Sequence, residues 1–163
     1  MRLLAAFLLL LVPAFALAES VGDKLKVERV VSPGGIEAWL VEERAVPVVA
    51  VEFAFEAGSR FDPKGKEGLA GLMAGLLDEG AGDMDATKFK AALEDKAIRM
   101  GFGARLDTIE GSMRTLAPYT DDAFKLLALA LSKPRFDKSA IERVRGQIEV
   151  ALAQDESDPS AIA

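Results

Sequence analysis

The order of hydrophobic periodicities along this chain is the feature that most constrains its fold. Apolar residues that alternate indicate strands, and apolar residues three or four positions apart indicate helices. The pattern predicts a β-hairpin, a third strand, two helices, two more strands and two final helices. These elements are predicted at residues 27–31, 36–41, 47–55, 68–79, 86–100, 102–108, 110–116, 120–132 and 139–155. Strands and helices in separate runs are typical of an α+β fold, so we expect a mixed or antiparallel sheet with helices packed on one face.

Cysteine and histidine are both absent from the 163 residues. Disulfides therefore cannot stabilise the fold, and zinc sites built from Cys or His are excluded for this chain. A Ser-His-Asp triad is excluded for the same reason. Half of the residues are hydrophobic, which is enough to build a core. The net charge of −6, without a basic patch, argues against nucleic acid as a partner.

The first 18 residues have the layout of a secretory signal peptide. Arg2 precedes an apolar run, and Ala16-Leu17-Ala18 is a small-x-small cleavage site before Glu19. The apolar run is shorter than the roughly 20 residues of a membrane-spanning helix, so we expect no stable membrane anchor. The pattern predicts a periplasmic or secreted protein cleaved near Ala18-Glu19. Residues 19–163 then form one domain, which we expect to be incomplete at its C-terminal end.

Several polar residues predict how the helices begin and end. Asp85 is suited to cap the helix that starts at residue 86. Ser139 and Glu142 have the spacing of a capping box for the last helix. Asp78 and Glu79 lie at the C-terminal end of a helix, where acidic side chains are unfavourable, so we expect them to be solvated on the surface. The alternative is that this acidic pair faces a partner.

A series of short segments along the chain carries a family resemblance. The loop contains Glu56-Ala57-Gly58-Ser59-Arg60-Phe61-Asp62-Pro63, followed by Gly65 and Glu67-Gly68-Leu69-Ala70. Later segments are Gly101-Phe102-Gly103-Ala104, Leu116-Ala117-Pro118, Lys133-Pro134-Arg135-Phe136-Asp137 and Glu142-Arg143-Val144-Arg145. In this order and spacing they resemble the insulinase/pitrilysin family of zinc peptidases, which includes the mitochondrial processing peptidases. The resemblance spans roughly residues 27–163 and implies the N-terminal domain of such a metallopeptidase.

The chain departs from this family at the residues that carry the chemistry. In active members the helix after the loop contains His-x-x-Glu-His, in which two His bind zinc and the Glu activates water. The corresponding residues here are Gly71, Ala74 and Gly75. The family's third ligand falls near 151–152, and Glu149 is close but out of register. The resemblance therefore implies a chain that is inactive on its own, with no catalytic or metal-binding residues and with zinc only in an active partner.

Two features of this region leave alternatives open. Gly71 and Gly75, one helical turn apart, form a bare strip that serves either for close packing or as an open groove. Arg60 and Asp62 are expected to fix the loop through a salt bridge or a helix cap. Arg60 is also the loop residue that we expect to contact a neighbouring subunit, if one does.

Members of this family often work in pairs, and the resemblance implies a partner for this chain. We expect a non-catalytic subunit of a periplasmic complex that helps an active zinc peptidase to enclose peptides or unfolded polypeptides. In active relatives the strand after the second helix pairs with the substrate, and the matching residues here are Ala104, Arg105, Leu106 and Asp107. The same residues would otherwise form an ordinary sheet edge or an internal strand. The remaining alternatives are a free-standing peptide-binding protein of the envelope and an active metallopeptidase with an unrecognised site.

Overall fold

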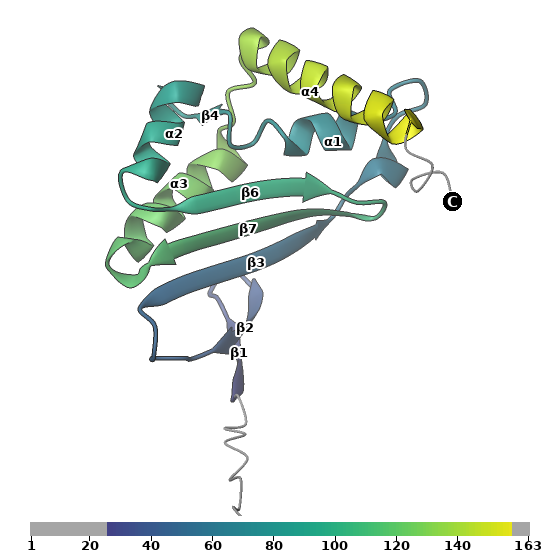
Figure 1. Cartoon of the computed structure of the whole chain (residues 1–163). Helices are drawn as coiled ribbons and strands as arrows, with labels where there is room; N and C mark the ends of the chain where they lie inside the picture. The colour runs from purple at the N-terminus through teal and green to yellow at the C-terminus, as the bar shows by residue number, and fades with distance from the viewer. Residues whose placement is uncertain (1–25, 158–163) are drawn as a thin grey trace, which may run out of the picture. The chain divides into compact units, whose positions relative to one another are not determined.

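The computed structural model describes residues 26–157 and has an α+β fold, as predicted (Figure 1). The chain divides into two compact units between Arg44 and Ala45. The predicted signal peptide lies outside the described residues. In chain order the elements are β1 (Val27–Val31), β2 (Glu37–Val41), β3 (Val48–Glu56), η1 (Ser59–Phe61), α1 (Leu69–Ala74), β4 (Gly80–Ala81), β5 (Met84–Asp85), α2 (Ala86–Glu94), β6 (Arg99–Ala104), β7 (Thr108–Leu116), η2 (Ala117–Tyr119), α3 (Thr120–Ser132) and α4 (Lys138–Ser157).

The first unit is the predicted β-hairpin. β1 and β2 pair antiparallel, with Arg29 opposite Trp39. The turn closes through a hydrogen bond in which the Gly35 amide donates to the Ser32 carbonyl at 2.9 Å, and Gly35 has a φ of 82° that glycine adopts without strain. Most of the apolar side chains of this hairpin are exposed, including Trp39 at 77%.

The second unit is built on a three-stranded antiparallel sheet in the order β3-β7-β6. β7 is the central strand, and its residues alternate between buried and more exposed positions. Met113 of β7 pairs with Val51 on one side and with Met100 on the other. These residues face the helices, whereas Ser112 and Arg114 point to the opposite face of the sheet and are exposed.

The helices cover one face of this sheet, as predicted. The main core joins the inward side chains of the strands to α2 and α3, and Phe89 of α2 and Ala123 of α3 are completely buried. A smaller cluster joins the end of α1 to α4 through Leu76, Ala140 and Val144. Figure 1 shows α1 and α4 together on the side of β6. No helix within residues 26–157 is both long enough and apolar enough to cross a membrane.

The helix predicted at residues 68–79 is shorter in the structure. α1 ends at Ala74, and the chain continues in tight turns in which the Leu77 amide bonds the Ala74 carbonyl and the Glu79 amide bonds the Leu76 carbonyl. Glycine lowers helix stability by about 1 kcal/mol relative to alanine. The two glycines of this segment, at positions 71 and 75, explain why the apolar pattern alone overestimated the helix.

Other boundaries also differ from the prediction. α2 ends at Glu94 rather than near residue 100, because Ala97 adopts a left-handed conformation and the chain enters β6 at Arg99. The strand predicted at residues 102–108 is therefore β6 (Arg99–Ala104). α4 begins at Lys138, so Ser139 lies inside its first turn and not at a capping box. The short ladder of β4 and β5 was not predicted.

Candidate functional site

The three positions predicted to correspond to the zinc motif, Gly71, Ala74 and Gly75, lie on α1 and at its end. Ala74 is 1% exposed and belongs to the packed interior. A Cβ atom added to Gly75 would lie 3.1 Å from Val144 Cγ1 of α4, whereas one added to Gly71 would meet nothing within 4 Å. The two alternatives for the glycine strip, close packing and an open groove, therefore each apply to one residue. Gly75 allows close packing of α4, and Gly71 faces open space.

The residues present in this region do not fit a zinc ion. Glycine and alanine side chains at 71, 74 and 75 offer no donor atom, whereas zinc requires at least three protein ligands. Glu149 of α4 is exposed and pairs with Arg145 at 3.4 Å along the same helix. Across the described part of the chain, no group of three or more acidic side chains is arranged to hold a metal ion. We therefore derive no metal-dependent step for this site.

The loop before α1 is packed against the connection between β6 and β7. The amides of Ser59 and Arg60 donate to the carbonyls of Arg105 and Leu106 at 3.0 and 2.9 Å. A Cβ atom at Gly58 would lie 2.6 Å from the Arg105 carbonyl oxygen, so only glycine fits at this close approach. The Arg60 guanidinium also pairs with the Asp107 carboxylate.

The same loop holds the start of α1. The Asp62 carboxylate accepts hydrogen bonds from the amides of Gly68 at 2.7 Å and Ala70 at 2.9 Å. These amides are among those that a helix leaves unpaired at its N-terminus. The predicted roles of Arg60 and Asp62, a salt bridge and a cap, are thus confirmed. The loop ties α1 to the end of β6 through both backbone and side-chain bonds.

The residues predicted to contact a peptide do not all lie in a strand. Ala104 is the last residue of β6, whereas Arg105, Leu106 and Asp107 form the connection to β7. The carbonyls of Arg105 and Leu106 accept the bonds from the loop described above, and Arg105 Nε pairs with the Glu110 carboxylate at 2.7 Å. Whether these four residues contact a peptide stays a prediction.

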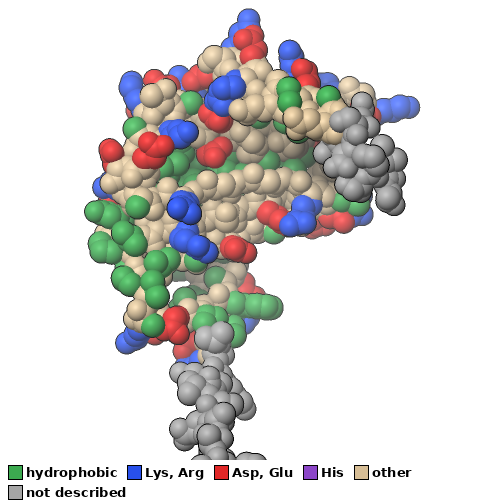
Figure 2. All heavy atoms as spheres, viewed as in Figure 1, with side chains coloured by type: hydrophobic (Ala, Val, Ile, Leu, Met, Phe, Trp, Pro, Cys, Tyr) green, Lys and Arg blue, Asp and Glu red, His purple; other side chains and the backbone are tan. Residues whose placement is uncertain are grey.

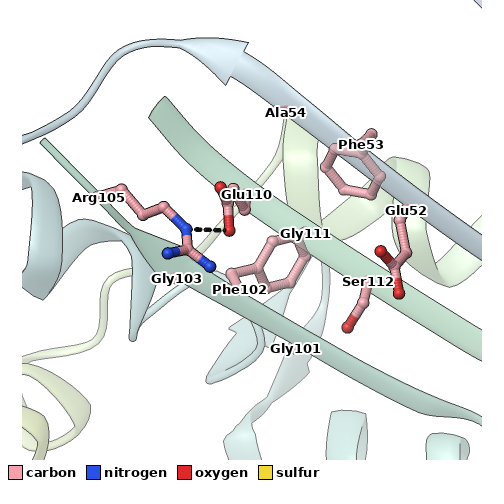
Figure 3. A pocket seen from close by; sticks show the side chains of 10 residues that line it. All are labelled: Glu52, Phe53, Ala54, Gly101, Phe102, Gly103, Arg105, Glu110, Gly111 and Ser112. Carbon is pink, nitrogen blue, oxygen red and sulfur yellow. Dashed lines mark hydrogen bonds and ion pairs between the residues drawn. The ribbon is translucent and has the colours of Figure 1, made fainter. Parts of the chain in front are cut away.

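A broad hollow of about 860 Å³ spans all three strands of the sheet (Figure 3). Gly101 and Gly103 of β6 contribute no side chain to it, and the Arg105–Glu110 ion pair lies at one end. Gly111 lies in register between Phe53 and Phe102, whose rings are 6.3 Å apart. A Cβ atom at Gly111 would lie 2.2 Å from the Phe53 ring, so the glycine makes room for the aromatic side chain. The hollow holds no pair of groups arranged for proton transfer.

A second hollow, of about 310 Å³, lies between α2, the start of β6 and the turn after α1. Figure 2 shows acidic and basic side chains gathered beside a hollow between the helices and β6. Glu79 in this turn forms a two-point ion pair with Arg143 of α4. Asp78 is half-buried, and burial raises the pKa of its carboxyl above the ordinary value.

The expectation that Asp78 and Glu79 are a solvated surface pair is therefore wrong. Glu79 is held by a helix that lies far along the chain, and Asp78 is shielded from water by the packing of the turn. Sequence reasoning missed both because their environment depends on tertiary contacts. The spacing of Glu79 and Arg143 carries no local signal that could have revealed the pair.

Comparisons with known proteins agree with this architecture. Residues 39–163 match the family described as Insulinase (Peptidase family M16). The chain is 33% identical over 117 residues to the Non-peptidase homolog YmxG of Helicobacter pylori (strain ATCC 700392 / 26695), and this match covers 72% of the chain and 27% of that protein.

Two crystal structures are similar to this fold. One is a peptidase M16 inactive domain from Pseudomonas fluorescens, with a TM-score of 0.77 and 27% identity over 85% of this chain and 34% of that one. The other is a protease from Helicobacter pylori, with a TM-score of 0.71 and 18% identity over 85% of this chain and 33% of that one, which shows the fold alone. The chain thus spans about a third or less of the length of these relatives. Glycine, alanine and glycine occupy the three positions predicted to match the family's inverted zinc motif. The chain belongs to the insulinase family, peptidase family M16.

Proposed function

We propose that this protein is a non-peptidase homologue that helps an active zinc peptidase of its own family to hold peptide substrates. The observation that carries the proposal is a contrast between two neighbouring segments. The loop of residues 58–62 is hydrogen-bonded to the β6–β7 connection and to α1, whereas the side chains at positions 71, 74 and 75 offer no atom that could bind a metal. A non-peptidase name for one relative and an inactive domain in another support the same conclusion.

The geometry of β6 supports the peptide-binding part of the proposal. β6 is an edge strand of the sheet in the described part of the chain. An extended peptide can add to such an edge through main-chain hydrogen bonds, while its side chains enter neighbouring pockets. Binding of this kind needs no metal, so it is compatible with the loss of the zinc ligands.

The proposed location is the periplasm or the exterior of the cell. The signal-peptide pattern of residues 1–18 supports it. An active family member exported to the same compartment is the proposed partner.

Co-purification of the full-length protein with an active family member from the same organism tests the proposal. We expect a stable complex in which only the partner binds zinc. The partner in this complex should cleave peptides faster than the isolated partner does. A protein that stays monomeric and does not alter the partner's activity would contradict it. Chelator-sensitive cleavage by the purified protein alone would instead favour an active metallopeptidase with an unrecognised site.

A free-standing peptide-binding protein is the second candidate, and the open edge of β6 favours it equally. The two are separated by one measurement. Peptide affinity that is the same with and without the active family member, together with the absence of a complex, supports the free-standing protein.

A further inference from the structure

We infer that the hollow between α2 and the start of β6 receives a lysine or arginine side chain of a peptide bound along β6. This inference rests on the proposed peptide-binding function and names the class of residue that the site selects. It depends on three features of the described residues: the backbone groups that β6 presents, the apolar lining of the hollow and the state of its carboxylates.

The hydrogen-bonding pattern of β6 shows which of its backbone groups face the open edge. The Arg105 amide donates to the Thr108 carbonyl at 2.7 Å, so Ala104 and Ile109 form a pair that is not hydrogen-bonded to each other. Such pairs alternate along antiparallel strands. The amides and carbonyls of Ala104, Phe102 and Met100 therefore point away from β7, toward the free edge.

The Met100 end of this edge adjoins the hollow. Met100 lies opposite Met113, which is buried on the helix-covered face of the sheet. Leu93 and Ile98 are buried, and with Met100 they form the apolar part of the lining. A peptide residue that pairs next to Met100 and points its side chain to the same face would enter the hollow.

The carboxylates of the hollow differ in what they already bind. Glu79 is held by Arg143, and Glu94 is exposed on α2. Asp78 is half-buried, and within residues 26–157 no side chain forms a hydrogen bond or ion pair with its carboxylate. The carboxylate accepts a hydrogen bond from its own backbone amide, and Arg143 and Lys90 attract it from a distance. A half-buried carboxylate with no side chain bonded to it favours a cation more strongly than a solvated one does.

A long basic side chain matches both parts of this lining. Lysine and arginine combine an apolar stem with a charged head, so the stem can lie on the apolar surface while the head reaches Asp78. Lys90 and Arg99 also border the hollow and are exposed, and the Lys90 charge lowers the pKa of the Asp78 carboxyl without forming an ion pair with it. An acidic peptide side chain in the hollow would lie near these two cations but also near the like charges of Asp78 and Glu94.

The inference can be tested with the full-length protein and three labelled extended peptides that differ at one central residue. This residue is lysine, norleucine, which has a similar apolar stem without the charge, or glutamate. We expect fluorescence anisotropy to show that the lysine peptide binds about tenfold more tightly than the norleucine peptide, a difference of about 1.4 kcal/mol. The glutamate peptide should bind most weakly.

Two variants localise the effect. Asp78→Asn should make the lysine and norleucine peptides bind equally and leave the affinity of the norleucine peptide unchanged. Asp83→Asn removes the same charge from an exposed turn outside the hollow and should preserve the lysine preference.

The possible failures are distinguishable. Equal binding of the three peptides to the unmodified protein, or tighter binding of glutamate, overturns the inference and leaves the proposed peptide binding intact. A lysine preference that survives Asp78→Asn places the cation elsewhere and also overturns it. If none of the three peptides binds, both the inference and the peptide-binding part of the proposed function fall.

Discussion

Two neighbouring segments of the second unit, the loop of residues 58–62 and the helical segment of residues 71–75, differ in the functional groups that they contain. The loop contains the residues that hold it in place: Gly58 leaves room for a backbone contact, and the Asp62 carboxylate caps α1. The helical segment keeps its place in the fold but offers no atom that binds a metal. The difference indicates that the loop stabilises the arrangement of α1 and β6 independently of catalysis.

The largest effect on stability is expected when the space at Gly58 is filled. Gly58→Ala would place a methyl group within 2.7 Å of three backbone atoms in residues 105–108, none of which can move without displacing the β6–β7 connection. We expect a loss of about 3 kcal/mol in the free energy of unfolding, at the upper end of overpacking effects. Chemical denaturation followed by circular dichroism measures it.

Gly103→Ala is the matched control for this substitution. A Cβ atom at Gly103 meets nothing within 4 Å, so the variant should be as stable as the unmodified protein or slightly more stable. Equal stability of the two variants would show that the loop is not held against the connection.

The next largest effect is expected at the helix cap. Asp62→Ala removes the acceptor of two amides, those of Gly68 and Ala70, and should lower the free energy of unfolding by about 1–2 kcal/mol. Hydrogen exchange should accelerate at these two amides. Asp107→Ala, which breaks only the exposed ion pair with Arg60, should have a smaller effect. A larger loss for Asp107→Ala would mean that the side-chain pair, not the cap, positions α1.

A third test compares the two glycines of the helical segment with each other. Gly71→Ala adds a methyl group to open space in a helix and should stabilise the protein by about 0.5–1 kcal/mol. Gly75→Ala brings a methyl group to 3.1 Å from Val144 and should give a smaller gain or a loss. Thermal unfolding of both variants measures the difference. An equal gain at both positions would show that α4 does not pack tightly on Gly75.

These substitutions also show which parts of the structure the sequence could predict. Strand alternation and turn residues are local signals, so the hairpin, the sheet strands and the roles of Arg60 and Asp62 were predictable. The glycines that shorten α1 are a local signal that the apolar pattern outweighed. Which of them contacts α4 depends on tertiary packing, which no local pattern records. The predicted end of β6 was wrong for a similar reason. The carbonyls of Arg105 and Leu106 accept hydrogen bonds from Ser59 and Arg60, which lie far away in the sequence.

Asp78 offers a smaller, pH-dependent effect at the end of the same segment. Burial raises the pKa of its carboxyl and Glu79 adds to the increase, while the Asp78 backbone amide, Arg143 and Lys90 oppose it. The folded state therefore binds this proton more tightly than the unfolded state does, and the charged carboxylate lowers stability at neutral pH. Asp78→Asn should slightly raise the melting temperature at neutral pH.

The stabilisation by Asp78→Asn should fade as the pH falls through the raised pKa toward about 4, the ordinary value for aspartate, because a protonated Asp and an Asn are both neutral. Melting temperatures of both proteins over this range test the sign. A gain that is constant with pH would show that packing, not charge, explains it.

No gain of activity is expected from the substitution that restores the motif itself. Gly71→His, Ala74→Glu and Gly75→His together supply two imidazoles and a carboxylate, but zinc hydrolysis also needs a third protein ligand. Glu149 is exposed and paired with Arg145, and the packing of Val144 against Gly75 leaves no room for a larger side chain without a shift of α4. We therefore expect no zinc-dependent peptide cleavage by the triple variant. Zinc content and peptide hydrolysis, measured with and without chelator, test this. Robust zinc-dependent cleavage would show that only the motif, and no other part of the site, separates this chain from its active relatives.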